Sequence, residues 1–157
     1  MNSAMTYEIS TSSSEATQAL ATKLAKHLRG GEVIELASDL GGGKTTFVQG
    51  LARGLGYRGD VTSPTFTLSQ IYKLPSFEIH HYDLYRLGQT GVVGDELTED
   101  LHDPKVVTII EWGGIMESDL PSDRLKIQFE VMGDEDRRLI FDAHGPVSER
   151  LVKELQS

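Results

Sequence analysis

The chain has 157 residues, 38% of them hydrophobic, which is enough for one compact domain with a buried core. It contains 24 Asp and Glu against 15 Lys and Arg, which gives a formal charge of −9, and it has no cysteine. These values exclude disulfides and thiolate metal sites. They also disfavour direct nucleic-acid binding, because such binding depends on basic side chains that neutralise phosphates.

The sequence shows no repeat, low-complexity tract or linker, so we predict one domain over residues 1–157, with residues 1–5 outside its ordered core. No apolar run approaches the roughly 20 residues that cross a bilayer. The start, MNSAMTYEIS, lacks the basic end and the apolar stretch of a secretory signal. We therefore expect a cytoplasmic protein that does not contact membranes.

The first predicted elements are a short strand at residues 7–9 and a helix within residues 12–31. Ser12 and Glu15 have the spacing of a capping box, which predicts the start of this helix. Gly30 and Gly31 are typical of its end. The apolar positions repeat every third or fourth residue and form one face, which contains Ala16, Leu20, Ala21, Leu24, Ala25 and Leu28.

A predicted strand at residues 32–38 leads into the sequence SDLGGGKTT, and a predicted helix follows at residues 44–56. The stretch resembles the phosphate-binding loop G-x-x-x-x-G-K-[ST], except that Ser38 stands where the first glycine belongs. The strand–loop–helix context supports this interpretation. Serine costs little at Ser38 if its φ is negative, whereas a positive φ would strain the backbone.

Such a loop would hold a nucleoside triphosphate by converging backbone N–H groups and the start of a helix. Lys44 would place its ammonium on the outer phosphates, the Thr45 hydroxyl would bind Mg²⁺, and Thr46 would contact an inner phosphate. The alternative is a glycine-rich turn followed by a surface lysine. The predicted loop contacts to the nucleotide are Asp39, Leu40, Gly41, Gly42 and Gly43.

The rest of the chain alternates between predicted strands and helices. We predict helices at residues 92–101 and 147–155. The predicted strands are residues 67–73, 78–83, 106–112, 124–132 and 137–143. This order predicts an α/β, P-loop NTPase-like three-layer fold, with a mainly parallel central sheet and an antiparallel C-terminal hairpin at its edge.

Asp83 and Glu111 each end a predicted strand. Because ligands gather at the carboxyl ends of the strands of an open parallel sheet, both acids are expected beside the phosphates. Thr65 lies in VTSPTFTL, a polar segment that could sense the terminal phosphate as switch segments do. His80 and His81 are adjacent on a strand and face opposite sides, so we expect no shared zinc site.

The motifs LGGGKTTFVQGL, SPTFTL, HHYDLYRL and IIEWGG occur in this order, and together they resemble the bacterial TsaE (YjeE) ATPases. The resemblance covers residues 32–114. It departs from the usual pattern at Ser38, at Gly42, at Phe66 and in the GG after Trp112. None of these departures replaces a group with a proposed catalytic role.

The resemblance implies a role for each matching residue. Lys44 would bind phosphate, Thr45 and Asp83 would bind Mg²⁺, and Glu111 would orient or activate water beside the metal. Trp112 would lie near the nucleotide, and Thr65 would belong to the switch-like segment. Arg86 matches the family motif DLYR, and its role stays open, with pairing to Asp95 or Glu96 as one alternative.

The resemblance also implies a Mg²⁺-dependent ATPase needed for threonylcarbamoyladenosine beside the anticodon of tRNA. Members associate with the proteins TsaD and TsaB, and TsaD carries the transferase chemistry, so an acidic protein would reach tRNA only indirectly. Two alternatives remain, a small-molecule kinase and a nucleotide-gated binding module that hydrolyses nothing. A GTPase is disfavoured because the sequence lacks the N-K-x-D motif that reads guanine.

Overall fold

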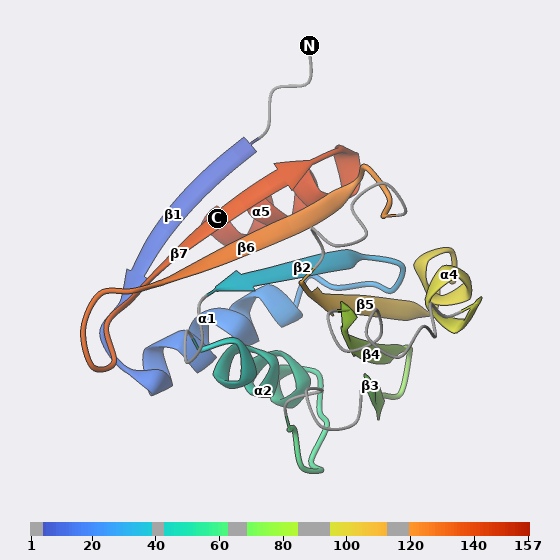
Figure 1. Cartoon of the computed structure of the whole chain (residues 1–157), viewed down its shortest axis with the longest axis horizontal. Helices are drawn as coiled ribbons and strands as arrows, with labels where there is room; N and C mark the ends of the chain where they lie inside the picture. The colour runs from blue at the N-terminus through green and yellow to red at the C-terminus, as the bar shows by residue number, and fades with distance from the viewer. Residues whose placement is uncertain (1–4, 39–42, 63–68, 85–94, 113–119) are drawn as a thin grey trace.

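The structure is a computed structural model that describes residues 5–38, 43–62, 69–84, 95–112 and 120–157. Strands and helices alternate through most of the chain (Figure 1). The strands are β1 (Met5–Thr11), β2 (Val33–Ser38), β3 (Ser69–Lys73), β4 (Glu78–Asp83), β5 (Val106–Glu111), β6 (Arg124–Val131) and β7 (Arg137–His144). The helices are α1 (Ser14–Ala25), α2 (Lys44–Gly54), α4 (Asp95–Leu101) and α5 (Pro146–Gln156).

The strands form one sheet of seven in the order β1-β7-β6-β2-β5-β4-β3. The central strand β2 pairs in parallel with β5 and β6, and β4 pairs in parallel with β5. The remaining pairs, β1 with β7, β6 with β7 and β3 with β4, are antiparallel. The predicted α/β fold with a parallel centre is therefore confirmed. The C-terminal hairpin is confirmed too, and β1 adds a further antiparallel strand outside it.

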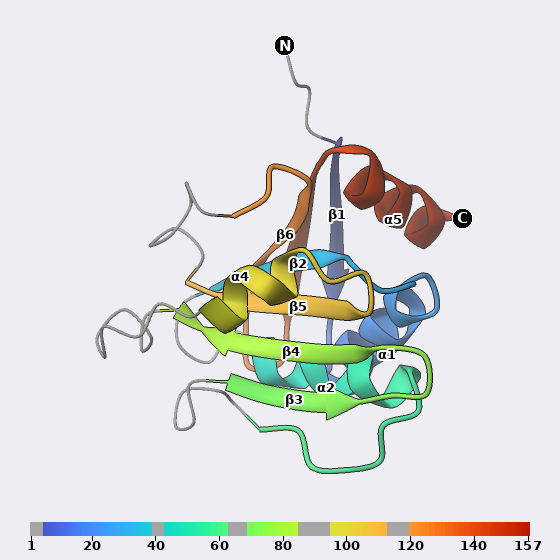
Figure 2. The same ribbon diagram turned by 90° about the vertical axis from the view of Figure 1, so that its right-hand side faces the viewer.

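Two hydrophobic clusters cover the two faces of the sheet. The larger cluster contains apolar side chains of α1, α2 and α5. The smaller cluster lies under α4 and includes Tyr82, Leu97 and Ile110. Figure 2 shows α4 over β4 and β5, with α1 and α2 beyond these strands. Alternate residues of a strand face opposite sides, so neighbouring residues of β4 and β5 enter different environments.

Most predicted boundaries agree with the structure, but the start and end of α1 were wrong. Its N-cap is Ser13, whose hydroxyl accepts a hydrogen bond of 3.0 Å from the Ala16 N–H, so Ser12 and Glu15 do not form the predicted capping box. The helix ends at Ala25, and the positive φ angles of Gly30 and Gly31 shape the turn into β2 instead. The first strand is longer than predicted and already includes Met5.

Close packing of α1 against α2 fixes the helix that begins with Lys44. A Cβ atom at Gly50 would lie only 2.6 Å from the Gln18 carbonyl oxygen and 2.8 Å from the Ala21 Cβ. The absence of a side chain at Gly50 therefore sets the distance between the helices. Within the described parts of the chain, no helix is long and apolar enough to cross a bilayer.

Gly50→Ala is expected to lower the free energy of unfolding by about 1–3 kcal/mol, because it overpacks the helix interface. At a helix position with open space around it, a change from Gly to Ala would instead stabilise the protein by roughly 0.5–1 kcal/mol. The sign of the change in unfolding free energy therefore tells whether Gly50 is closely packed. Urea unfolding of Gly50→Ala checks this, with Arg53→Ala, an exposed position of the same helix, as the control. A stabilised Gly50→Ala protein would contradict the packing.

Candidate functional site

Ser38 occupies the position of the first loop glycine without backbone strain. It is the last residue of β2 and pairs in parallel with Phe129 of β6. Among the described residues other than glycine, Trp112 alone has a positive φ, so Ser38 has the negative φ that serine adopts easily. The serine is therefore compatible with the turn from the strand into the loop.

The described part of the loop has the expected connection to a helix. Gly43 is the N-cap of α2 with a φ of 101°, a conformation that favours glycine. Lys44, Thr45 and Thr46 form the first turn of α2, where backbone N–H groups point out of the helix end. The predicted site residues Asp39, Leu40, Gly41, Gly42, Thr65 and Arg86 lie outside the described residues.

Lys44 contacts Glu111, as expected for a site at the carboxyl ends of the strands. The Lys44 Nζ lies 3.1 Å from the Glu111 Oε1, which joins the start of α2 to the last residue of β5. Both side chains are largely shielded from water, so their charges interact more strongly than on an open surface. The structure thus brings together a phosphate-binding candidate and a water-orienting candidate that are 67 positions apart.

His81 is a third member of the cluster and was not predicted as a site residue. Its Nε2 lies 2.7 Å from the Glu111 Oε2, at ion-pair distance but without the alignment of a hydrogen bond. His81 is fully buried. The sequence places His81 on the same strand face as Asp83, because the two are two residues apart, but its contact with Glu111 depends on the register between β4 and β5.

The surroundings of Glu111 keep it ionised. Burial is the largest influence and raises the pKa of this carboxyl, but the neighbouring His81 and Lys44 together outweigh it. The net result is a pKa below the ordinary value for glutamate. Glu111 is therefore a carboxylate at neutral pH, the form that can accept a hydrogen bond from water.

Asp83 lies beside Glu111 in the sheet. The two residues are register partners at the ends of the parallel strands β4 and β5, and both are buried. Their carboxylates, together with the Thr45 hydroxyl, offer the oxygen ligands that Mg²⁺ prefers. This donor set fits the predicted magnesium site. Both Glu111 oxygens contact basic groups in this structure, Oε1 the Lys44 Nζ and Oε2 the His81 Nε2.

Trp112 covers the outer side of the cluster in an unusual conformation. Its φ is 64°, which is uncommon for a residue with a large side chain, and strained residues of this kind cluster at functional sites. Its side chain is exposed, and the Lys44 Nζ lies 5.8 Å from the centre of its ring, within the range of a cation–π contact. Trp112 is therefore placed to sense changes at Lys44.

A second polar cluster lies on the opposite face of the sheet. His80 Nδ1 lies 2.5 Å from Asp100 of α4, and its Nε2 lies 3.1 Å from Glu78. The Tyr82 hydroxyl also donates to Asp100. The two adjacent histidines therefore face opposite sides, as predicted. Although Glu96 is close enough to join a metal site with His80 and Asp100, both His80 nitrogens already contact carboxylates.

His80 is expected to make stability depend on pH. Burial lowers its pKa, but Glu78 and Asp100 outweigh burial, so the folded-state pKa lies above the ordinary 6.5. Protonation thus favours folding. The stability that His80 contributes is complete below about pH 6.5, and it is lost as pH rises through the raised pKa of the folded state. The melting-temperature difference between wild type and His80→Gln should shrink as pH rises. A constant difference for His80→Gln would contradict this.

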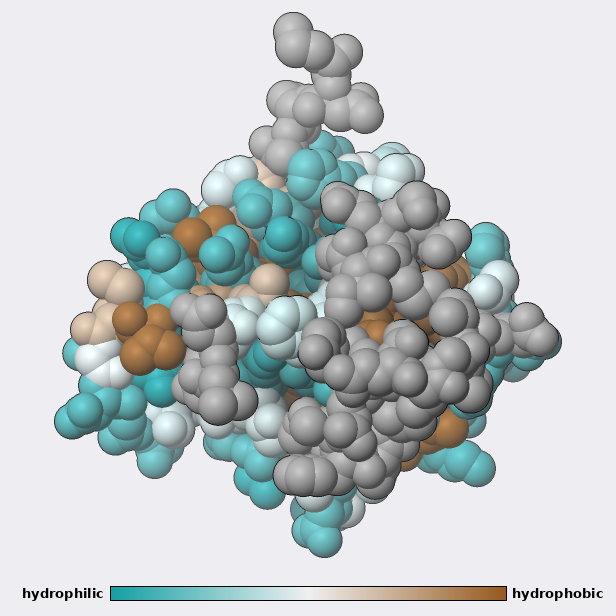
Figure 3. Space-filling model, in the orientation of Figure 1, coloured by the Kyte–Doolittle hydropathy of each residue, from teal (hydrophilic) through white to brown (hydrophobic). Residues whose placement is uncertain are grey.

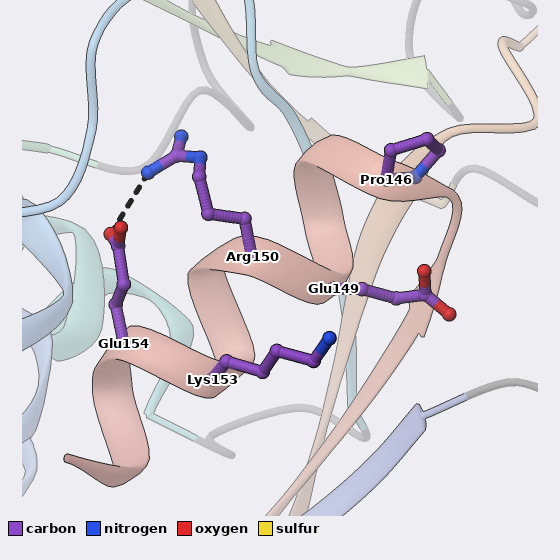
Figure 4. Close-up of a pocket in the computed structure, with 5 residues that line it drawn as sticks. All are labelled: Pro146, Glu149, Arg150, Lys153 and Glu154. Atoms are coloured by element: carbon purple, nitrogen blue, oxygen red, sulfur yellow. Dashed lines mark hydrogen bonds and ion pairs between the residues drawn. The ribbon is translucent and has the colours of Figure 1, made fainter.

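A cavity of about 500 Å³ on α5 is not part of the phosphate site. It is lined by Pro146, Glu149, Arg150, Lys153 and Glu154, which are drawn in Figure 4. Arg150 contacts Glu154 at 2.9 Å and also Glu32 at 3.2 Å, immediately before β2 begins. The cavity therefore lies near the start of β2, whereas the phosphate loop follows the other end of that strand. The ion pairs of Arg150 hold α5 against the rest of the protein.

Comparison with known proteins agrees with this architecture. The family model described as "Threonylcarbamoyl adenosine biosynthesis protein TsaE" matches residues 11–140. The chain is 39% identical to the Bacillus subtilis tRNA threonylcarbamoyladenosine biosynthesis protein TsaE, over 90% of this chain and 88% of the relative. It is 38% identical to the Streptomyces coelicolor protein of the same name, over 73% and 80% of the two chains.

A solved structure shows the same fold. The crystal structure of Bacillus subtilis YdiB superposes with a TM-score of 0.84 at 31% sequence identity, covering 99% of this chain and 97% of that chain. The matches of sequence and of fold extend over most of the molecule, including both strands that carry Asp83 and Glu111. The chain therefore belongs to the TsaE family of threonylcarbamoyl adenosine biosynthesis proteins.

Proposed function

We propose that this protein is a Mg²⁺-dependent ATPase that supports threonylcarbamoyladenosine modification of tRNA by binding and resetting a complex of TsaD-like and TsaB-like proteins. The observation that carries the proposal is the buried contact between Lys44 and Glu111 at the start of α2. In this contact, the cation that would bind phosphate lies next to an ionised carboxylate. Membership of the TsaE family supplies the link to threonylcarbamoyladenosine.

Each residue of the site would have a separate role in hydrolysis. The ammonium of Lys44, now held by Glu111, would move to the terminal phosphates of ATP, which carry more negative charge than one carboxylate. Glu111 would then still contact His81 through its Oε2. Its Oε1, which Lys44 contacts in this structure, could accept a proton or a hydrogen bond from the attacking water. Trp112, close to Lys44, would shield this region from bulk solvent.

Mg²⁺ would be held by Asp83 and Thr45, with Glu111 nearby. When bound, the ion neutralises charge that develops on the phosphates during transfer. The protein's own contribution is to fix two carboxylates at the ends of adjacent parallel strands, in a pairing that leaves little freedom of movement. The acidic surface of the protein fits a role in which TsaD, and not this chain, handles the tRNA.

The test is Mg²⁺-dependent release of phosphate from ATP, measured for the purified protein alone and with TsaD and TsaB from the same organism. We expect slow turnover alone and faster turnover with both partners. ATP binding without turnover in any mixture would contradict the ATPase and would support a nucleotide-gated binding module. Phosphate transfer to a small molecule in place of water would support a kinase.

A further inference from the structure

A histidine and three carboxylates meet between α4 and the face of the sheet that α4 covers. Glu78, His80 and Tyr82 are alternate residues of β4, so their side chains share one face of the strand. Glu96 and Asp100 are four positions apart on α4 and therefore lie on one side of that helix. Because α4 lies over β4 and β5 (Figure 2), the two sets of side chains form one cluster.

The spacing of three of these side chains fits a small metal ion. The ligand atoms of His80, Glu96 and Asp100 all lie within 4.8 Å of one another. Tetrahedral Zn²⁺ binds nitrogen and carboxylate oxygen at about 2.0–2.2 Å, which separates its ligands from each other by about 3.4 Å. Asp100, 2.5 Å from the His80 Nδ1, would have to move away by about 1 Å. Glu96 is exposed and can approach by rotation of its side chain.

The other contacts of the cluster match the surroundings of a histidine that binds a metal. Such a histidine coordinates through one nitrogen and donates its other N–H to a carboxylate or carbonyl oxygen, which fixes the orientation of the ring. The His80 Nδ1 faces Asp100, and its Nε2 lies 3.1 Å from a carboxylate oxygen of Glu78. The Tyr82 hydroxyl donates to Asp100, just as ligating carboxylates accept further hydrogen bonds. These contacts orient His80 for an ion at Nδ1.

The charge of the cluster favours a cation. Glu78, Glu96 and Asp100 are three acidic groups beside the single basic group His80, which contacts two of them. Among the residues that the structure describes, no lysine or arginine forms an ion pair with any of the three. Their mutual repulsion is strongest where water is scarce, and a divalent ion between them would remove it.

Thr108 provides an independent observation that points to a ligand. It is the register partner of His80 on β5 and stands two residues before Ile110, which belongs to the hydrophobic cluster under α4, so it faces α4 as well. Thr108 is fully buried, and its hydroxyl has no hydrogen-bond partner within the described part of the chain. Buried hydroxyls are nearly always hydrogen-bonded, so a group that bonds this one is missing. A water on the ion would supply it.

We infer that His80, Glu96 and Asp100 bind a divalent transition-metal ion, for which Zn²⁺ is the best match, and that this ion holds α4 on the sheet. Three nitrogen and oxygen ligands with a water in the fourth position suit Zn²⁺, whereas Mg²⁺ and Ca²⁺ prefer oxygen ligands alone. The ion would enter beside exposed Glu96, and the right-hand side of Figure 3 shows hydrophilic surface in this region. The inference does not depend on the proposed ATPase, because the two sites lie on opposite faces of the sheet.

The test is calorimetric titration of the whole chain with Zn²⁺ alone at about pH 8, which favours the neutral imidazole that binds metals. Glu96→Gln removes a ligand at an exposed position, so the fold should persist and Zn²⁺ binding should weaken at least about 10-fold. Glu78→Gln, which changes the outer contact of His80, should weaken it about 10- to 100-fold. The matched control is Glu99→Gln, an exposed acid of the same helix outside the cluster, which should leave binding unchanged.

Asp83→Asn separates this site from the predicted magnesium site. The expected result is a Zn²⁺-binding step that weakens in Glu96→Gln and stays unchanged in Asp83→Asn. A step that is lost in Asp83→Asn and unchanged in Glu96→Gln would place the ion at the ends of β4 and β5 and overturn the inference. Equal weakening by Glu96→Gln and Glu99→Gln would overturn it too, since it would show only a general attraction to an acidic helix. Wild-type protein that binds no Zn²⁺ would also overturn it.

Discussion

Glu111→Gln is expected to reduce ATP hydrolysis by about 10²- to 10⁴-fold, the range for loss of a positioned general base, while ATP still binds. Glutamine has nearly the same shape, but it cannot take a proton from water and carries no charge to hold His81 and Lys44. Because Lys44 loses its carboxylate partner, its ammonium becomes more available to phosphate, so ATP affinity should stay equal or rise. Single-turnover hydrolysis and calorimetric ATP titration measure the two effects separately.

The matched control is Glu35→Gln. Glu35 is also buried in the sheet, and it pairs with Arg124 on the neighbouring strand at 2.9 Å. Its loss should destabilise the fold in a similar way, since a buried ion pair is broken in both variants. Hydrolysis by folded Glu35→Gln should match that of wild type. Equal loss of hydrolysis in both variants would show that Glu111 acts through stability alone.

Lys44→Ala is expected to weaken Mg·ATP binding about 10- to 150-fold, which corresponds to one charge-assisted hydrogen bond of about 1.5–3 kcal/mol. The change removes the ammonium beside Glu111 and the cation near the Trp112 ring. Calorimetric titration with Mg·ATP measures the loss. Lys73→Ala, an exposed lysine at the end of β3, is the control for a general loss of positive charge.

Trp112 provides an independent readout of the same variant. It is the single tryptophan of the chain, so the fluorescence of the protein reports on this position. In wild type, ATP should change that fluorescence because Lys44 leaves the ring to bind phosphate. In Lys44→Ala, the change should be much smaller at saturating ATP. If Lys44→Ala binds ATP as strongly as wild type, the loop is better explained as a glycine-rich turn followed by a surface lysine.

Local spacing was enough to predict the parts of the site that lie within a few residues of each other. The strand that ends at Ser38 and the helix that begins with Lys44 follow from hydrophobic runs and glycines, and the strand ends at Asp83 and Glu111 follow from the apolar runs before them. The contact between His81 and Glu111 was missed because it depends on the register between β4 and β5, which joins residues 30 positions apart. The positive φ of Trp112 likewise has no local sequence signal.

In the antiparallel part of the sheet, too, local features could be predicted from the sequence and long-range pairings could not. The β6–β7 hairpin was predictable because its two strands flank one short polar turn. The place of β1 outside β7 was not, since this pairing joins residues such as Tyr7 and Phe141 from opposite ends of the chain. A cavity lined by residues such as Ser10, Thr11 and Arg137 depends on that pairing, so it could not be predicted from the sequence.

If ATP hydrolysis at Glu111 serves threonylcarbamoyladenosine formation, the number of modified tRNA molecules made per complex should depend on that hydrolysis. Purified TsaD and TsaB from the same organism would be combined with wild-type protein or with Glu111→Gln, under conditions in which tRNA is in excess. If hydrolysis resets the complex, wild type supports many rounds and Glu111→Gln supports no more than about one. If Glu111→Gln binds ATP without hydrolysing it and still supports as many rounds as wild type, hydrolysis does not reset the complex.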